Sequence, residues 1–271
     1  MKSTFGTIVL AASLLASTSA MAAGTSIVAA DNFEQAAKGT VVGTAGGTGW
    51  VSGWQSGLGA TAPTVITPVS AMQGSQSLQF TANSNSAAYR DLSTSISGDV
   101  LVRFAFQYTG VLGGNDFLGL YFGTANTGND GPNLGLKANC GAGACPAGQD
   151  GFVRLGATSQ YLAKSDLVAG QTYVLFGHLY KTNASVTYNN FDAWLNPTDA
   201  EMLSLTTPDA QARGASSVAS FSTMGFRTAN LDDGVTVRVD DISVSAIPEP
   251  ATIALFGAAL LGMGALRRRR A

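Results

Sequence analysis

The chain has 271 residues, of which only 12% are charged and 33 are glycine, a composition that favours short strands joined by turns and disfavours a helical protein. Five of the fifteen basic residues lie at the two ends of the chain, and the part between those ends keeps ten basic and sixteen acidic residues, a formal charge of −6. Because an acidic body repels phosphate backbones, we expect no nucleic-acid partner.

The N-terminal residues 1–22 have the order of a secretory signal peptide. Lys2 precedes an apolar stretch at 5–16, and Ala20 and Ala22 are small residues at the positions that a signal peptidase reads. We therefore expect signal peptidase to cleave after Ala22 or Ala23 and the remainder to be exported. The alternative, a buried N-terminal helix, explains this order less well.

Two tryptophans, Trp50 and Trp54, stand four residues apart in the stretch GGTGWVSGW at 46–54. This spacing places both on the same face of a strand. If they are exposed, their rings are candidates for glycan contact by stacking on sugar C–H faces. If they are buried, they pack the core, which is the interpretation that the sequence favours.

Four stretches in the middle of the chain have the apolar pattern of strands. At 100–108 apolar residues alternate with a period of two, and 116–123, 171–180 and 187–196 are similar apolar runs. The last of them ends at Asn196-Pro197, a turn signal. Residues 199–205 are expected to form a short helix or an irregular loop.

Cys140 and Cys145 lie in one glycine-rich stretch, NCGAGACPAGQDG. In an oxidising compartment this pair predicts a disulfide that closes a small loop. A metal site would need more soft ligands nearby. A redox pair would normally have the Cys-x-x-Cys spacing, which is missing here.

Towards the end of the body, the alternation at 234–245 slips by one residue at Asp240-Asp241, which predicts a β-bulge. With no helical crossovers between the predicted strands, we expect ten to thirteen short strands in one antiparallel sandwich spanning residues 23–247. The stretches DNFE (31–34), GGTGWVSGW (46–54), FDAWLNPTDAE (191–201) and RVDDISVS (238–245) resemble concanavalin A-like, laminin-G-like domains. This resemblance implies an all-β jelly-roll β-sandwich.

Carboxylates gather in sequence near the two ends of this body. The first and last strands of a sandwich often lie side by side, which would bring Asp31 near Asp240 and Asp241. Domains of the resembling class sometimes bind a structural calcium ion at such a seam, through carboxylate and carbonyl oxygens. An ordinary bulge with solvated acids is the alternative, and the residues favour it. No other cofactor is expected.

The body offers few catalytic residues. Its one histidine, His178, lies in a predicted central strand, and no Gly-x-Ser-x-Gly motif accompanies it. Its only glutamates, Glu34 and Glu201, do not form the paired Glu-x-Asp-x-x-Glu strand of sandwich-fold glucanases. We therefore predict a protein that is not an enzyme and that has no catalytic residues.

The C-terminal segment 248–271 combines three parts. Pro248, Glu249 and Pro250 precede an uncharged stretch at 251–266, which as a helix would be roughly 24 Å long. Four arginines follow, which snorkel to the interface and hold that end in the cytoplasm: Arg267, Arg268, Arg269 and Arg270. This predicts a short transmembrane helix with the body on the far side of the membrane. A core helix with a basic tail is the alternative.

These three parts in this order closely resemble the PEP-CTERM sorting signal. The resemblance implies an exosortase, a membrane-embedded cysteine transpeptidase, as the partner that cleaves at or near Pro248, Glu249 and Pro250. Two hypotheses of function follow. The first is a non-enzymatic protein, briefly anchored in the inner membrane and then placed at the cell surface or in the extracellular matrix, in contact with exopolysaccharide or biofilm. The second is a secreted carbohydrate-active enzyme, a glycoside hydrolase or lyase, on the same fold.

Overall fold

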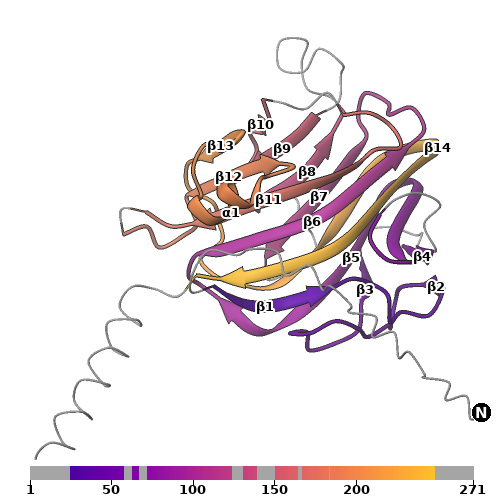
Figure 1. Cartoon of the computed structure of the whole chain (residues 1–271), viewed down its shortest axis with the longest axis horizontal. Coiled ribbons are helices and arrows are strands. Elements are labelled where there is room, and N and C mark those ends of the chain that lie inside the picture. The colour runs from indigo at the N-terminus through magenta and orange to yellow at the C-terminus, as the bar shows by residue number, and fades with distance from the viewer. Residues whose placement is uncertain are drawn as a thin grey trace, which may run out of the picture.

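The computed structural model describes residues 25–57, 63–66, 72–123, 131–138, 150–163, 167–182 and 184–247. In these ranges the chain forms fourteen strands and one short helix, and the strands pair antiparallel (Figure 1). The predicted signal peptide, both cysteines and the segment 248–271 lie outside the described residues.

Two long strands form the frame of the molecule. β5 (Ser77–Ile96) and β14 (Phe221–Ala246) pair along most of their lengths, and their register breaks between Leu231 and Thr236. Before this break β14 pairs with β7, and after it β14 pairs with β6, so β14 passes from one layer of the sandwich to the other (Figure 1). The expectation of short strands only was wrong for these two elements.

The remaining strands extend the two layers on either side of β5 and β14. In the first layer these strands are β7 (Phe117–Gly123), β8 (Asn133–Lys137), β9 (Asp150–Arg154), β10 (Gln160–Tyr161) and β3 (Gln55–Gly57). In the second layer they are β6 (Val100–Thr109), β11 (Thr172–Tyr180), β12 (Asn190–Leu195), β13 (Ala210–Arg213), β1 (Ser26–Asp31), β4 (Thr64–Ile66) and β2 (Gly39–Thr40).

The main hydrophobic core lies between the two layers. Phe104 of β6 meets Phe226 of β14 edge to face at 5.1 Å between ring centroids, and Phe122 of β7 meets Phe191 of β12 at 6.0 Å. Each pair joins one layer to the other, and burying a side chain of this kind stabilises the fold by about 1.5–3 kcal/mol. The predicted all-β antiparallel sandwich is confirmed.

The connection after β12 is a left-handed turn followed by a capped helix. Asn196 has φ +50°, and its side-chain oxygen accepts a hydrogen bond from the Val174 amide of β11 at 2.8 Å. Thr198 and Glu201 form a capping box that starts α1 (Asp199–Ser204). Met202 of α1 packs against a small apolar cluster on the outer face of the second layer. Of the two alternatives for this segment, the helix is the one that forms.

The predicted bulge and the predicted seam between first and last strands are both confirmed. The pairing of β14 with β6 jumps from Asp240 opposite Ala105 to Ser243 opposite Arg103. Asp241, in the bulge, has φ +48°. β1 lies beside β14 with Asp31 opposite Ile242, so this carboxylate stands next to the bulge.

Candidate functional site

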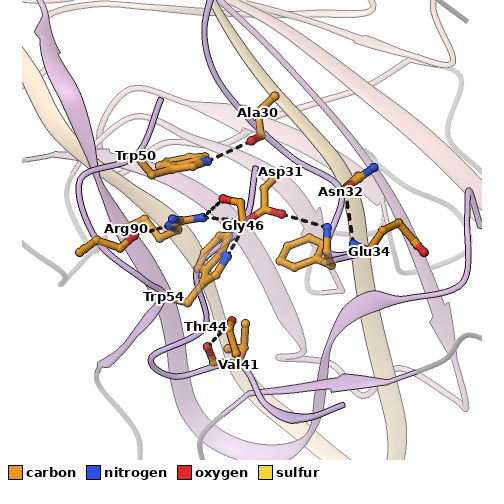
Figure 2. Close-up of polar contacts among 12 residues, drawn as sticks. Ala30, Asp31, Asn32, Glu34, Val41, Thr44, Gly46, Trp50, Trp54 and Arg90 are labelled. Atoms are coloured by element: carbon orange, nitrogen blue, oxygen red, sulfur yellow. Dashed lines mark hydrogen bonds and ion pairs between the residues drawn. The ribbon is translucent and has the colours of Figure 1, made fainter. Parts of the chain in front are cut away.

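A buried ion pair joins β1 to β5, next to the seam between β1 and β14. The Asp31 Oδ2 atom lies 2.9 Å from Arg90 Nη1 and accepts a second hydrogen bond from Trp54 Nε1 at 2.9 Å (Figure 2). The other oxygen of Asp31 accepts from the Phe33 amide at 2.9 Å. The side chains of Arg90 and Asp31 are only 3% and 4% exposed, so each is the main compensation for the other's charge.

Arg90 also binds the loop that leads to β3. Its guanidinium donates to the Gly46 carbonyl oxygen and to the Ser52 carbonyl oxygen, both at 2.8 Å. Burial lowers the pKa of Arg90, and the charge of Asp31 opposes this shift. Arg90 therefore helps to tie the 46–54 loop to the frame of the fold, together with backbone hydrogen bonds such as that from the Thr48 amide to the Ala30 carbonyl oxygen.

The two tryptophans surround this arginine and belong to the core edge. Trp54 is 2% exposed, and its ring lies 5.5 Å from Phe33 and 6.1 Å from Trp50. Trp50 is half-buried and donates from Nε1 to the Ala30 carbonyl oxygen, and its ring centroid lies 4.9 Å from Cζ of the Arg90 guanidinium (Figure 2). The glycan-contact prediction is wrong for Trp54, because its enclosed ring has no face left for a sugar. The core-packing alternative accounts for this residue.

The glycines of the same loop allow it to lie directly on β1. A Cβ atom at Gly47 would stand 2.0 Å from the Ala30 carbonyl oxygen, and one at Gly49 would stand 1.8 Å from that of Val28. Both glycines have positive φ, at +65° and +81°. The GGTGW stretch is therefore a close-packing motif of the seam.

Asp240 is a buried carboxyl group at the bulge. It is fully buried, its Oδ1 accepts the Asp241 amide at 2.8 Å, and its Oδ2 has no hydrogen-bond partner among the described residues. Burial raises its pKa to about 8; the amide of Asp241 opposes this shift, and the charges of Asp241, Glu34 and Asp31 add to it. The folded protein therefore holds Asp240 protonated at neutral pH.

Asp31, Asp240 and Asp241 do not form the calcium site considered for them. Within the described ranges, no three acidic, histidine or cysteine side chains gather closely enough to hold a metal ion. Both oxygens of Asp31 already accept hydrogen bonds, and Asp240 Oδ1 accepts the Asp241 amide. The alternative of solvated acids also needs correction, because Asp31 and Asp240 are buried.

A groove of about 750 Å³ lies beside this seam, on the outer face of the second layer. The turn after β12 and α1 form one wall, the end of β1 and the bulge form the other, and β6 and β11 contribute residues between them. Burial raises the pKa of Asp241 in this groove, and the positive charge of Arg103 opposes the shift. Residues that line the groove include Asp31, Asn32, Arg103, Asn196, Met202 and Asp241.

His178 lies away from this groove, at the other end of β11. Its Nε2 atom is 3.6 Å from Asp99 Oδ2, and its ring stacks on that of Tyr180 at 4.2 Å. These contacts fit the structural role expected for this histidine.

Two arginines of the site were not singled out from the sequence. Arg103 carries a signal, because it is the one charged residue in the apolar strand at 100–108 and alternates with core residues Val102 and Phe104. Arg90 carries none, because the stretch around it is polar and its partner Asp31 is distant in sequence.

Residues 246–270 match the family described as the PEP-CTERM protein-sorting motif, so the chain carries this sorting motif, which implies export and sorting by an exosortase. The predicted PEP-CTERM resemblance is confirmed. No curated protein is similar in sequence to this chain. In the described part of the chain, no helix has the length and apolar character needed to cross a membrane.

Several solved structures resemble the body. The cellulose-induced protein Cip1 is 17% identical, with 70% of this chain and 90% of that chain covered at a TM-score of 0.39. The Emp47p carbohydrate recognition domain is 13% identical, with coverages of 77% and 94% and a TM-score of 0.44. The carbohydrate-binding module CBM66 of Bacillus subtilis is 12% identical, with coverages of 71% and 95% and a TM-score of 0.41. Similarity at this level identifies neither a ligand nor a reaction for this chain.

The sorting motif begins on the last residue of β14. Ala246 still pairs with Ser26 of β1 and Val100 of β6. The amide of the next residue, Ile247, donates to the Asp99 carbonyl oxygen at 3.0 Å, and its side chain packs against the apolar cluster that contains Met202. The tail is thus joined to the rigid sandwich without a spacer in the described residues.

Proposed function

We propose that this protein is a non-enzymatic component of the cell surface or extracellular matrix, sorted by exosortase and associated with exopolysaccharide. The observation that carries the proposal is the PEP-CTERM motif at residues 246–270, attached directly to the end of β14. A β-sandwich domain followed by a sorting motif is the organisation expected of a protein that is exported and then delivered to the cell surface. Its own acidic charge favours neutral or cationic partners over anionic ones.

The pairing of Ser26 with Ala246 supports a single orientation of the body during export. The predicted mature N-terminus and the root of the sorting tail leave the same end of the sandwich. An exosortase acting at Pro248, Glu249 and Pro250 meets its substrate directly against the folded domain.

Mass spectrometry of the surface form tests the processing. We expect an N-terminus at Ala23 or Gly24 and a C-terminus near Glu249 or Pro250, without the four arginines. Replacing Pro248, Glu249 and Pro250 together by alanine should abolish this processing, whereas Asp233→Ala, at an exposed position, should leave it unchanged. An intact arginine tail on the surface form of the natural protein would contradict the proposal.

Retention of the processed protein on purified exopolysaccharide tests the association. We expect retention to persist in a calcium chelator, because the carboxylate of Asp31 is engaged by Arg90 and Trp54. A protein that passes through the column in calcium and in chelator alike would refute the association, while leaving the sorting unaffected.

One observation favours the alternative of a carbohydrate-active enzyme: Asp31, Asp199 and Asp241 line the same groove. Glycoside hydrolysis needs two positioned carboxyl groups, one of them free to attack or activate water. Asp31 is held by Arg90, and Asp199 lies exposed at the rim. We therefore propose binding without hydrolysis, and release of reducing ends or unsaturated sugars from the exopolysaccharide would reverse this assignment.

A further inference from the structure

We propose that the groove between the β1–β14 seam and α1 binds a neutral polysaccharide chain. This inference rests on the proposed function, because it names the contact site and the class of glycan for the same association. It moves the glycan contact from Trp50 and Trp54 to residues that the sequence analysis did not assign to a glycan.

The groove has the size and rigidity of a binding site. Its volume of about 750 Å³ is within the range of roughly 300–1,000 Å³ typical of small-molecule sites. The wall residues Asn196 and Asp241 have φ of +50° and +48°, and the former is pinned to β11 by its side chain. On the opposite rim, the backbone at Gly47 lies directly against Ala30 of β1. Because the residues of the groove are already held in place without a ligand, binding costs them little conformational entropy.

The groove also offers a donor and an acceptor that the protein does not use. Arg103 and Asp241 both line it, and neither side chain makes a hydrogen bond or an ion pair within the described residues. A guanidinium can only donate and a carboxylate can only accept, whereas a sugar hydroxyl does both. Neighbouring hydroxyls of one sugar ring can therefore bind Arg103 and Asp241 together.

The charge of the groove selects against acidic glycans. Arg90 neutralises Asp31. Among the described residues that line the groove, Arg103 is then the single cation beside Asp199 and Asp241, so this lining keeps a negative excess. A uronate or phosphate group in the groove would be repelled by these two carboxylates. The walls are otherwise short polar and aliphatic side chains such as Val174 and Met202, which suit the C–H groups of a neutral sugar.

Calorimetry on the processed protein tests this assignment with neutral gluco-, manno- and galacto-oligosaccharides and with oligouronates of equal length. We expect binding of at least one neutral series and weaker binding of the uronates. Asp241→Asn and Arg103→Gln should each weaken the neutral ligand about tenfold or more, as expected for hydrogen bonds to charged groups. Asparagine is a suitable replacement because it tolerates the positive φ of position 241.

The matched controls are Asp233→Asn and Lys38→Gln, which remove one charge of each sign at exposed positions and should leave binding unchanged. Thermal melts establish that each variant is folded, and Thr48→Trp, at an exposed rim position, should block the groove without a change of charge.

If the natural protein binds and the folded groove variants bind equally well, the groove assignment is overturned while the association with exopolysaccharide stands. If oligouronates bind more tightly, the neutral class is overturned. If the natural protein binds neither the oligosaccharides nor the exopolysaccharide, both this inference and the proposed association fail.

Discussion

Replacing Arg90 with methionine should lower the free energy of unfolding by about 3–5 kcal/mol, because the variant leaves the carboxylate of Asp31 buried without a countercharge. The same change removes the hydrogen bonds to the carbonyl oxygens of Gly46 and Ser52, so the loop that carries both tryptophans loses this attachment and keeps its backbone contacts to β1 and β5 and the bonds of its tryptophan side chains. Urea denaturation followed by tryptophan fluorescence measures the loss, since Trp50 and Trp54 lie on either side of the replaced side chain.

The matched control is Arg213→Met. Arg213 also pairs with an aspartate, Asp192, which is 8% exposed, but the Arg213 side chain is 41% exposed against 3% for Arg90, so solvent reaches this pair and we expect a smaller loss than for Arg90→Met. In the double variant Asp31→Leu with Arg90→Met, stability should return part of the way to that of the natural protein, because no buried charge remains although Trp54 Nε1 and the Phe33 amide lose their acceptor. An Arg90→Met protein as stable as the Arg213→Met protein would show that the buried pair is not what holds the seam.

The second large effect is a pH dependence of stability that Asp240 imposes. Its pKa is about 8 in the folded protein and near the ordinary 3.8 when unfolded, so between these values the folded state holds a proton that the unfolded chain releases. The contribution of Asp240 to stability is therefore fully present below about pH 4 and is lost as the pH rises through about 8. Asp240→Asn should remove this dependence and stabilise the protein at pH 9 by at most roughly 6 kcal/mol, at about 1.4 kcal/mol per pKa unit.

Urea denaturation between pH 4 and pH 9 measures this slope in the natural protein, in Asp240→Asn and in the exposed control Asp233→Asn. Burial also raises the pKa of Asp241, against the opposing charge of Arg103, so a weaker slope of the same sign should remain in Asp240→Asn. Equal slopes in the natural protein and Asp240→Asn would mean that Asp240 is ionised in the folded state, contrary to this account.

The pattern of apolar residues was sufficient for the strands that are half-buried along a regular face. The alternation at 100–108 correctly placed Val102, Phe104 and Phe106 in the core, and the slip at Asp240-Asp241 correctly placed the bulge. In both stretches the apolar residues follow the two-residue period of a strand, and this pattern does not depend on which strands lie beside them.

β5 and the first half of β14 could not be predicted in this way. β5 is rich in serine, threonine and asparagine, and it becomes a strand of twenty residues because β14 offers it a continuous row of backbone partners. Strand preference of this kind depends on the neighbouring strand more than on the residue types. The same holds for Trp54, whose ring is equally suited to a sugar or to a core. Phe33 and Arg90, which lie on other segments, enclose it.

The sequence alone determined the sorting motif and the all-β class, because a linear motif and a period of two are properties of the chain itself. Only the tertiary structure decided that Asp31 neutralises Arg90, that Asp240 is buried and protonated, and that Arg103 and Asp241 line one groove. Each of these depends on which distant segments the seam between β1 and β14 brings together. Burial and charge compensation are set by that packing, and the local sequence around each residue does not indicate them.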